Sequence, residues 1–157
     1  MKHLLLFLAL ITGTAAQAAS GLPVPRFVSL RSDQINLRTG PGTRYPIKWL
    51  YQKSDLPVEI IDEHENWRKI RDFYGKTGWV HQQMLSGRRM IRLKEDTLLR
   101  RAATPDSLPI ARIEKGAVGK LKLCPPAVGL CLADFGELEG WVSKPALFGV
   151  YAGETLE

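Results

Sequence analysis

The residues best suited to chemistry by type are a histidine among acids and a pair of cysteines. His64 lies between Glu63 and Glu65, two residues after Asp62. A carboxylate beside an imidazole could serve general acid–base catalysis. Such catalysis needs an enclosed pocket that shifts pKa values, whereas charged residues in a turn are normally solvated. No nucleophile pairs with this cluster at a recognisable spacing, so we expect the protein not to be an enzyme.

The two cysteines, Cys124 and Cys131, enclose the residues Pro-Pro-Ala-Val-Gly-Leu. A disulfide between them would close a loop of about eight residues and stabilise the fold by about 2.5 kcal/mol on the chain-entropy estimate. The alternative is a zinc site that recruits His64 and His81 from distant segments, because no paired C-x-x-C spacing is present. We expect the disulfide, and neither a metal nor a cofactor.

A sharp turn carries the clearest candidate for binding. In the stretch INLRTGPGTRYPI, residues 35–47, two glycines permit positive φ on either side of a proline whose own φ is fixed. We expect this loop to be rigid and to hold Arg38, Arg44 and Tyr45 at one end of the fold. Cations beside an aromatic ring can bind a carboxylate or a peptide at low ordering cost. The alternative is a structural corner in which Tyr45 packs as a lid.

The aromatic residues divide between core and surface by the alternation of side chains along a strand. Trp67 and Ile70 would lie on opposite faces unless a bulge intervenes. If Ile70 fills the core, Trp67 is free to line a groove, where an aromatic ring beside arginine suits peptide or sugar contacts. A small barrel also needs aromatic rings inside, and we assign that position to Trp79 and Trp141.

The elements that must position these residues are short strands. Segments rich in Val, Ile, Trp and Tyr are broken by Gly, Pro, Asp and Asn, and no window sustains a helical period beyond a single turn at 81–85. The predicted strands are 34–38, 47–52, 57–62, 67–72 and 77–81 in the first half, and 97–100, 110–113, 117–123, 130–135 and 138–143 in the second. The predicted fold class is therefore all-β.

The two halves resemble each other at a displacement of 62 residues. Leu37-Arg38 recurs as Leu99-Arg100, and Gly78-Trp79-Val80 recurs as Gly140-Trp141-Val142. Equal spacing of two anchors indicates two diverged copies of one module. Five short strands at this spacing form a small, partly open barrel, so we expect two barrels in tandem.

The first 18 residues have the layout of a secretory signal peptide, with Lys2, an apolar run over 4–11 and small residues before Ala18. The run is shorter than the roughly 20 residues that span a membrane. We therefore expect cleavage after Ala18, export into a bacterial periplasm and no stable membrane insertion. The further boundaries that we expect are an extended arm at 19–26, a first barrel at 27–86, a connecting segment at 87–96, a second barrel at 97–151 and a frayed tail at 152–157.

Charge is concentrated in the first half. From Ala19 to Leu93, Lys and Arg outnumber Asp and Glu by 13 to 7, whereas from Lys94 to Glu157 there are 8 bases and 9 acids. A basic half in an exported protein suggests anionic envelope polymers, lipid headgroups or acidic proteins rather than nucleic acid. The alternative is a solvated basic face that aids solubility. Arg88, Arg89 and Arg92 alternate with apolar residues, which predicts a connecting strand whose basic face is solvated.

Three motifs of the first half together resemble a known family. They are N-L-R-x-G-P-G-x-x-Y-P at 36–46, W-x-x-I at 67–70 and G-W-V at 78–80. In combination they resemble the bacterial SH3-like (SH3b) domain of exported proteobacterial proteins, over residues 28–85. The second half keeps Leu-Arg and Gly-Trp-Val but has Ala-Ala-Thr-Pro at 102–105 in place of Gly-Pro-Gly. The resemblance implies a non-catalytic module, several members of which bind peptidoglycan or its peptide.

We therefore expect a periplasmic module that binds cell-wall peptide or another anionic envelope component through its first barrel. The expected contact residues are Arg38, Arg44, Tyr45, Trp49, Trp67 and Tyr74. One alternative is a scaffold that pairs with an envelope protein, with the basic face steering association. Another is a small cell-wall hydrolase, whose activity would depend on His64 or His81.

Overall fold

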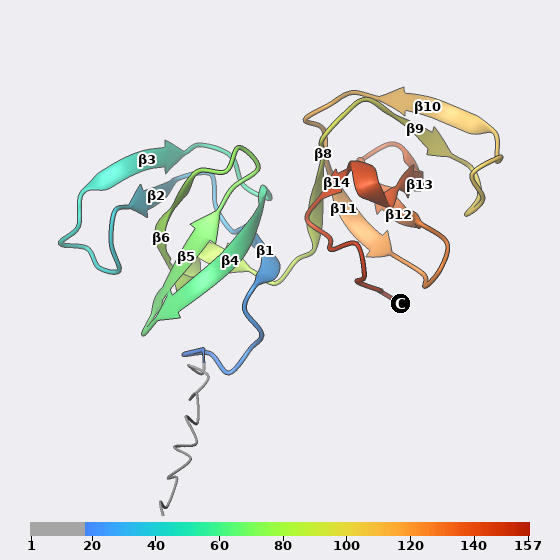
Figure 1. The fold of residues 1–157 in the computed structure, drawn as a ribbon. Helices are drawn as coiled ribbons and strands as arrows, with labels where there is room; N and C mark the ends of the chain where they lie inside the picture. The colour runs from blue at the N-terminus through green and yellow to red at the C-terminus, as the bar shows by residue number, and fades with distance from the viewer. Residues whose placement is uncertain (1–17) are drawn as a thin grey trace, which may run out of the picture.

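The computed structural model of the chain describes residues 18–157. Within this range, fourteen β-strands form two seven-stranded antiparallel sheets, which curl into two units lying side by side (Figure 1). Each sheet also has one single-turn 3-10 helix before its last strand. The prediction of an all-β fold is confirmed. No helix in the described range is long and apolar enough to cross a membrane. The signal peptide was predicted at residues 1–18, which, apart from Ala18, lie outside the described residues, so it stays a prediction.

The first sheet contains the strands β1 (Arg26–Leu30), β2 (Ile35–Arg38), β3 (Ile47–Tyr51), β4 (Pro57–His64), β5 (Trp67–Arg71), β6 (Thr77–His81) and β7 (Leu85–Ser86), with the helix η1 (Gln82–Met84) before β7. Their order in the sheet is β3-β2-β6-β5-β4-β1-β7. Strand β3 therefore lies at one edge of the sheet and pairs with β2 alone.

The second sheet contains β8 (Met90–Leu93), β9 (Thr97–Arg100), β10 (Pro109–Ile113), β11 (Val118–Leu123), β12 (Leu130–Asp134), β13 (Glu139–Ser143) and β14 (Leu147–Phe148), with η2 (Lys144–Ala146) before β14. Their order, β10-β9-β13-β12-β11-β8-β14, repeats that of the first sheet strand for strand. The strands predicted in both halves are present within two residues at each end. Residues 87–96 were expected to connect the barrels, but β8 is an inner strand of the second sheet, between β11 and β14.

The glycine of the Gly-Trp-Val motif is needed for the same steric reason in both sheets. A Cβ atom on Gly78 would lie 2.6 Å from Cγ of Leu37 and 2.8 Å from the carbonyl oxygen of Arg38. On Gly140 it would lie 2.7 Å from Cγ of Leu99 and 2.8 Å from the corresponding carbonyl oxygen. Only glycine therefore lets β6 approach β2, and β13 approach β9, this closely.

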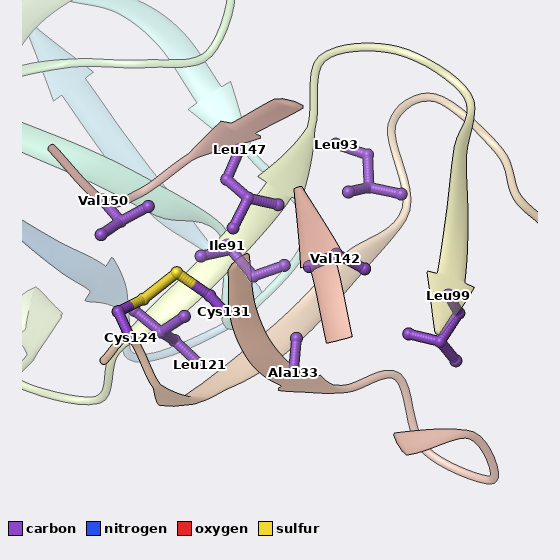
Figure 2. Packing of buried hydrophobic residues seen from close by; sticks show 10 residues of the cluster. All are labelled: Ile91, Leu93, Leu99, Leu121, Cys124, Cys131, Ala133, Val142, Leu147 and Val150. Atoms are coloured by element: carbon purple, nitrogen blue, oxygen red, sulfur yellow. A yellow bond between two sulfur atoms is a disulfide. The ribbon is translucent and has the colours of Figure 1, made fainter. Parts of the chain in front are cut away.

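Each sheet encloses its own hydrophobic core. The first core comprises Leu30, Ile35, Leu37, Tyr51, Val58, Ile60, Ile70, Val80 and Leu85. The second comprises the ten residues labelled in Figure 2, and includes both cysteines. Strand β8 supplies Ile91 and Leu93 to this second core while Arg92 points to the other face, as its alternating sequence predicts.

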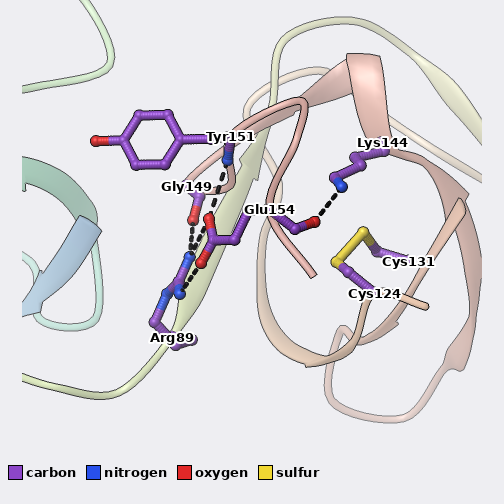
Figure 3. The surroundings of a disulfide bond; sticks show 7 residues. All are labelled: Arg89, Cys124, Cys131, Lys144, Gly149, Tyr151 and Glu154. Atoms are coloured by element: carbon purple, nitrogen blue, oxygen red, sulfur yellow. Dashed lines mark hydrogen bonds and ion pairs between the residues drawn. A yellow bond between two sulfur atoms is a disulfide. The ribbon is translucent and has the colours of Figure 1, made fainter. Parts of the chain in front are cut away.

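A cross-link closes the same corner of both sheets by different chemistry. In the first sheet, Glu63 lies opposite Arg68, and a carboxylate oxygen of Glu63 is 3.3 Å from Nε of Arg68. Glu63 and Arg68 are the second pair of residues beyond a bulge in the pairing of β4 with β5. The pairing of β11 with β12 has the same bulge, and Cys124 and Cys131 take the same positions beyond it. These two form the predicted disulfide (Figure 3), so they are not zinc ligands.

The two ends of the described chain each fasten one of these corners. In the first sheet, the backbone N–H and hydroxyl of Ser20 donate to the Glu63 carboxylate at 2.7 and 2.8 Å, and Arg26 pairs with it at 2.6 Å. The extended arm is thus a clip on β4. Burial opposes ionisation of the Glu63 carboxyl, but the hydrogen bonds from Ser20 and Arg26 outweigh it and lower the pKa below its ordinary value.

The C-terminal tail was expected to be frayed, and this is wrong. Leu156 exchanges two backbone hydrogen bonds with Cys124, at 2.7 and 3.0 Å. The Glu154 carboxylate pairs with Arg89 and accepts from the backbone N–H of Tyr151, and Lys144 donates to the Glu154 carbonyl oxygen (Figure 3). Burial opposes ionisation of Glu154, but the bonds from Arg89 and Tyr151 outweigh it and lower its pKa.

The two units contact each other through an aromatic cluster. The ring of Phe148 lies edge-on to Phe27 and Phe73, with centroids 5.2 and 5.6 Å away, and Tyr151 packs on Phe27 at 4.6 Å. The Tyr151 hydroxyl donates to the buried carboxylate of Glu59 at 2.8 Å. Burial, together with this hydrogen bond, raises the pKa of Tyr151. The first sheet therefore contacts the second through packed rings as well as through the chain.

Candidate functional site

The Gly-Pro-Gly loop is a structural corner held from within. The Arg38 guanidinium donates to the carbonyl oxygens of Thr43 and Tyr45 at 3.1 and 2.9 Å, so it closes the loop. The Tyr45 ring lies against Gly40, where a Cβ atom would be 2.4 Å from it. In the second sheet, Arg100 donates to the Ser107 carbonyl oxygen at 2.7 Å in the same way. Tyr45 therefore packs as a lid on the loop, as the structural alternative expected. The guanidinium of Arg38 is bound by the backbone of the same loop.

Arg44 lies on the exposed side of this loop. Its guanidinium is 5.0 Å from the centroid of the Tyr45 ring and donates to the Tyr45 hydroxyl at 3.2 Å. That hydrogen bond raises the pKa of Arg44. Arg44 is thus a solvent-facing cation that could meet an anionic partner.

Trp67 stands on the outer face of β5, as alternation predicts, because Ile70 and Arg68 occupy the inner face. Its ring is half-buried, with the His81 ring edge-on at 5.4 Å. Two open hollows of about 510 and 220 Å³ adjoin it, the larger bounded also by Arg44 and the smaller by Arg38. This surface gathers three of the six predicted contact residues.

The histidines and the remaining tryptophans have structural surroundings. Nδ1 of His81 accepts a hydrogen bond from the backbone N–H of Gln83, which caps the helix η1. His64 is exposed beside the Glu63 carboxylate that fastens the arm. Trp79 and Trp141 were expected in the cores, but both are only half-buried, because their glycine and valine neighbours occupy the inner face. The rings lie on the outer face of their strands.

A separate cavity of about 300 Å³ lies at the edge of the first sheet. It is bounded by strand β3, the start of β4, the turn between β5 and β6, and strand β8 of the second sheet. Its wall is mostly apolar and includes Leu50, Leu56 and Val58. The predicted residues Trp49 and Tyr74 stand on its rim, 47% and 74% exposed. Two large rings so open to solvent are a common sign of a contact surface.

Cations accompany these rings. The Lys76 ammonium lies 3.0 Å from the centroid of the Trp49 ring, on its face, which is a cation–π contact. Lys53 borders the cavity from the loop after β3. Neither lysine pairs with a carboxylate among residues 18–157. The rim is therefore positively charged above an apolar wall.

The acid that borders the cavity is already satisfied. Asp72 accepts hydrogen bonds from the backbone N–H groups of Tyr74 and Lys76 and from the Tyr51 hydroxyl, each at 2.9 Å. Burial, reinforced by this carboxylate, raises the pKa of Tyr51, so its hydroxyl stays protonated and remains a donor. Asp72 thus fixes the turn that presents Tyr74 and Lys76, rather than offering a reactive group to a ligand.

Strand β8 of the second sheet contributes Arg92. Its guanidinium stacks 4.6 Å from the centroid of Phe73 and 5.1 Å from that of Tyr74. It donates to the Tyr74 hydroxyl at 3.0 Å and, through Nε, to the Gly116 carbonyl oxygen at 3.1 Å. The expectation of a solvated basic face on this strand is wrong for Arg92, and also for Arg89, which is engaged by the tail.

The six predicted contact residues therefore lie on two surfaces. Trp49 and Tyr74 border the cavity, Arg38, Arg44 and Trp67 border the other surface, and Tyr45 packs against its own loop. The binding role of each residue stays a prediction. Sequence reasoning missed the cavity's cations. Lys76 could have been noticed two residues after Tyr74 in the same turn. Arg92 carries no local signal, because it reaches the cavity only through the packing of one sheet on the other.

The second sheet lacks this combination at the equivalent positions. The register pairs Leu37 with Trp49 in the first sheet and Leu99 with Ala111 in the second, so a methyl group replaces the indole. Leu138 stands before β13 where Lys76 stands before β6. Neither the ring nor the cation is present there.

The strand content and order place the protein among the all-β SH3-like folds. Residues 31–87 match the model of the family described as bacterial SH3 domain, which supports an SH3b-type domain over the first sheet. No curated protein matches the chain.

Among solved structures, the chain is similar to NlpC2 and NlpC1 from Trichomonas vaginalis, each at 11% sequence identity. The likeness to NlpC2 covers 80% of this chain and 48% of that one, with a TM-score of 0.36. The likeness to NlpC1 covers 85% and 49%, with a TM-score of 0.35. The chain thus spans about half the length of each of these proteins.

Proposed function

We propose that the protein is a non-catalytic binding module of the bacterial cell envelope. It holds a peptidoglycan peptide, or another anionic envelope component, in the cavity beside β3. The match of residues 31–87 to the bacterial SH3 domain supports a module associated with the cell wall. The proposal includes export through the N-terminal signal peptide, and it involves neither nucleic acid nor a cofactor.

The observation that carries the proposal is the composition of the cavity. Its apolar wall and two exposed rings can bury the non-polar part of a ligand, which is the main source of affinity in small sites. Its rim of Lys53, Lys76 and Arg92 has no carboxylate partner among residues 18–157, so its charge favours an anionic ligand. Asp72 is the one acid among the lining residues, against these three cations, so the charge around the cavity stays positive.

We further propose that the second half is a diverged copy of the same domain. The identical strand order, the shared bulge and the glycine at the crossing of β13 and β9 support this relation. Because Ala111 and Leu138 replace the ring and the lysine, the second copy does not bind the same ligand by itself.

Retention on purified sacculi tests the proposed site. Truncating an aromatic contact residue commonly costs more than about 1 kcal/mol of binding, so the double variant Trp49→Ala/Tyr74→Ala should bind at least about tenfold more weakly. Leu108→Ala, which removes an exposed side chain from the loop before β10, is the control and should be retained like the wild type. Retention should also fall in about 0.5 M NaCl, because salt screens exposed charges.

Trp67→Ala separates the two candidate surfaces. It should leave retention unchanged if the cavity is the site. Loss of retention with Trp67→Ala, but not with the double variant, would assign binding to the other surface. Absence of retention of the wild type at low salt, together with co-purification of one envelope protein, would favour a protein scaffold instead.

A further inference from the structure

The guanidinium of Arg92 is held in one orientation, in which it can bind an anion. Its stacking on Phe73 and Tyr74 and its bond to the Gly116 carbonyl oxygen fix its plane. Nη1 has no acceptor among residues 18–157 and the group is not fully buried, so it can donate to a ligand. An arginine whose geometry is already fixed loses little side-chain entropy when it binds.

The Tyr74 hydroxyl extends this donor set. It accepts a hydrogen bond from Nη2 of Arg92 at 3.0 Å, so its own proton is available to donate. Nη1 of Arg92 and the Tyr74 hydroxyl therefore form two neighbouring donors, one of them charged. Two donors side by side match the two oxygens of a carboxylate.

We propose that the two sheets form one composite site, in which Arg92 of the second sheet and Tyr74 of the first bind the terminal carboxylate of a short peptide. This inference rests on the proposed function and specifies which ligand group is recognised. The second copy lacks the aromatic ring and the lysine that border the cavity of the first copy. It then acts by completing the site of the first.

A terminal carboxylate fits the cavity better than a side-chain carboxylate. The donors of Arg92 and Tyr74 adjoin an apolar wall that includes Leu56 and Val58, in a volume of about 300 Å³. A C-terminal residue with a small apolar side chain carries both matching groups on a single carbon atom. An internal Asp or Glu would instead bring polar backbone on both sides of the carboxylate into the apolar region, at a desolvation cost.

The test compares the affinities of two peptides for two proteins, each measured by NMR titration. The peptides are N-acetyl-Ala-Ala-Ala as the free acid and as the C-terminal amide, and the proteins are the full chain with Arg92 and its Arg92→Gln variant. The wild type should bind the acid about tenfold more tightly than the amide, the usual size of one lost charge-assisted contact. The variant should lose most of this preference, because only the Tyr74 hydroxyl and the more distant lysines of the rim then favour the acid.

Two controls keep the result interpretable. Arg101→Gln removes an exposed arginine from the loop after β9 and should keep the wild-type preference for the acid. The acid and amide are also compared on the unaltered protein, so the central comparison holds even if Arg92→Gln loosens the contact between the sheets.

The outcomes separate this inference from the proposed function. A wild type that is retained on sacculi but binds acid and amide equally, or binds neither, overturns the inference alone. A preference for the acid that is undiminished in Arg92→Gln overturns the assignment to Arg92. A wild type that binds neither sacculi nor peptide overturns the proposed function together with the inference.

Discussion

The change Gly78→Ala should destabilise the first sheet strongly, although it adds only one methyl group. The added Cβ would lie 2.6 Å from Cγ of Leu37 and 2.8 Å from the carbonyl oxygen of Arg38. Leu37 is fully buried in the core and cannot turn away freely. Arg38 pairs with Trp79 across β2 and β6, so its carbonyl cannot move without disturbing that pairing.

The magnitude follows from overpacking in a dense interior. Inserting a methyl group into a well-packed core costs about 1 to 3 kcal/mol, and contact with a fixed backbone atom places Gly78→Ala near the upper end. A loss of about 2 to 3 kcal/mol lowers the ratio of folded to unfolded protein by roughly 30- to 150-fold. For a chain of this size it lowers Tm by about 5 to 10 °C.

Urea and thermal denaturation, followed by circular dichroism, measure this loss. Gly87→Ala is the control, because a Cβ atom there meets nothing within 4 Å, and it should leave stability unchanged or slightly raised. Gly140→Ala should destabilise the second sheet in the same way, since its Cβ would lie 2.7 Å from Leu99. If Gly78→Ala unfolds at the same temperature as Gly87→Ala, the close approach of β6 to β2 is not the reason for the glycine.

Three further changes test other contacts. Reducing the Cys124–Cys131 disulfide should cost about 2.5 kcal/mol of stability and release the tail, seen as faster amide exchange at residue 156; unchanged exchange would contradict the link between the two. Because the pKa of Glu63 is lowered in the folded state, its stabilising contribution is present above pH 4.5 and lost as pH falls through the folded pKa, so Glu63→Gln should flatten acid denaturation curves in that range, and parallel curves would refute this. Tyr151→Phe leaves the buried Glu59 without one donor and should cost about 1.5 kcal/mol in urea denaturation, whereas no cost would mean that this bond does not help to join the sheets.

The strands and the outer position of Trp67 could be predicted from the sequence because their causes are local. Runs of β-branched and aromatic residues between glycines and prolines define the strands, and side-chain alternation separates Trp67 from Ile70. The displacement of 62 residues between the halves likewise anticipated the matching strand orders. Such patterns act within a strand or a hairpin, so they survive without tertiary information.

The features that were missed depend on contacts between distant segments. Strand β8 was taken for a connection because its partners, β11 and β14, come later in the chain. The tail was expected to fray because nothing near residue 156 indicates its pairing with Cys124. Arg92 reaches the cavity only because the two sheets pack together, and no pattern within β8 predicts which face meets the other sheet.

That an ion pair in the first sheet and a disulfide in the second take the same position could not be seen in the sequence either. Arg68 and Cys131 share no chemistry, and only the strand registers show that they occupy the same position. Arg68 and its partner Glu63 close the corner between β4 and β5, and Cys131 and its partner Cys124 close the corner between β11 and β12. Equivalent structural needs can thus be met by unrelated side chains.

The most direct test of the proposed binding site is a nitrogen-15 NMR titration of the protein with soluble cell-wall fragments. The four tryptophans give four indole N–H signals, of which only that of Trp49 borders the cavity. We predict that the Trp49 signal shifts in a saturable manner while those of Trp67, Trp79 and Trp141 stay in place. A saturable shift of the Trp67 signal with an unmoved Trp49 signal, or no shift of any signal, would contradict it.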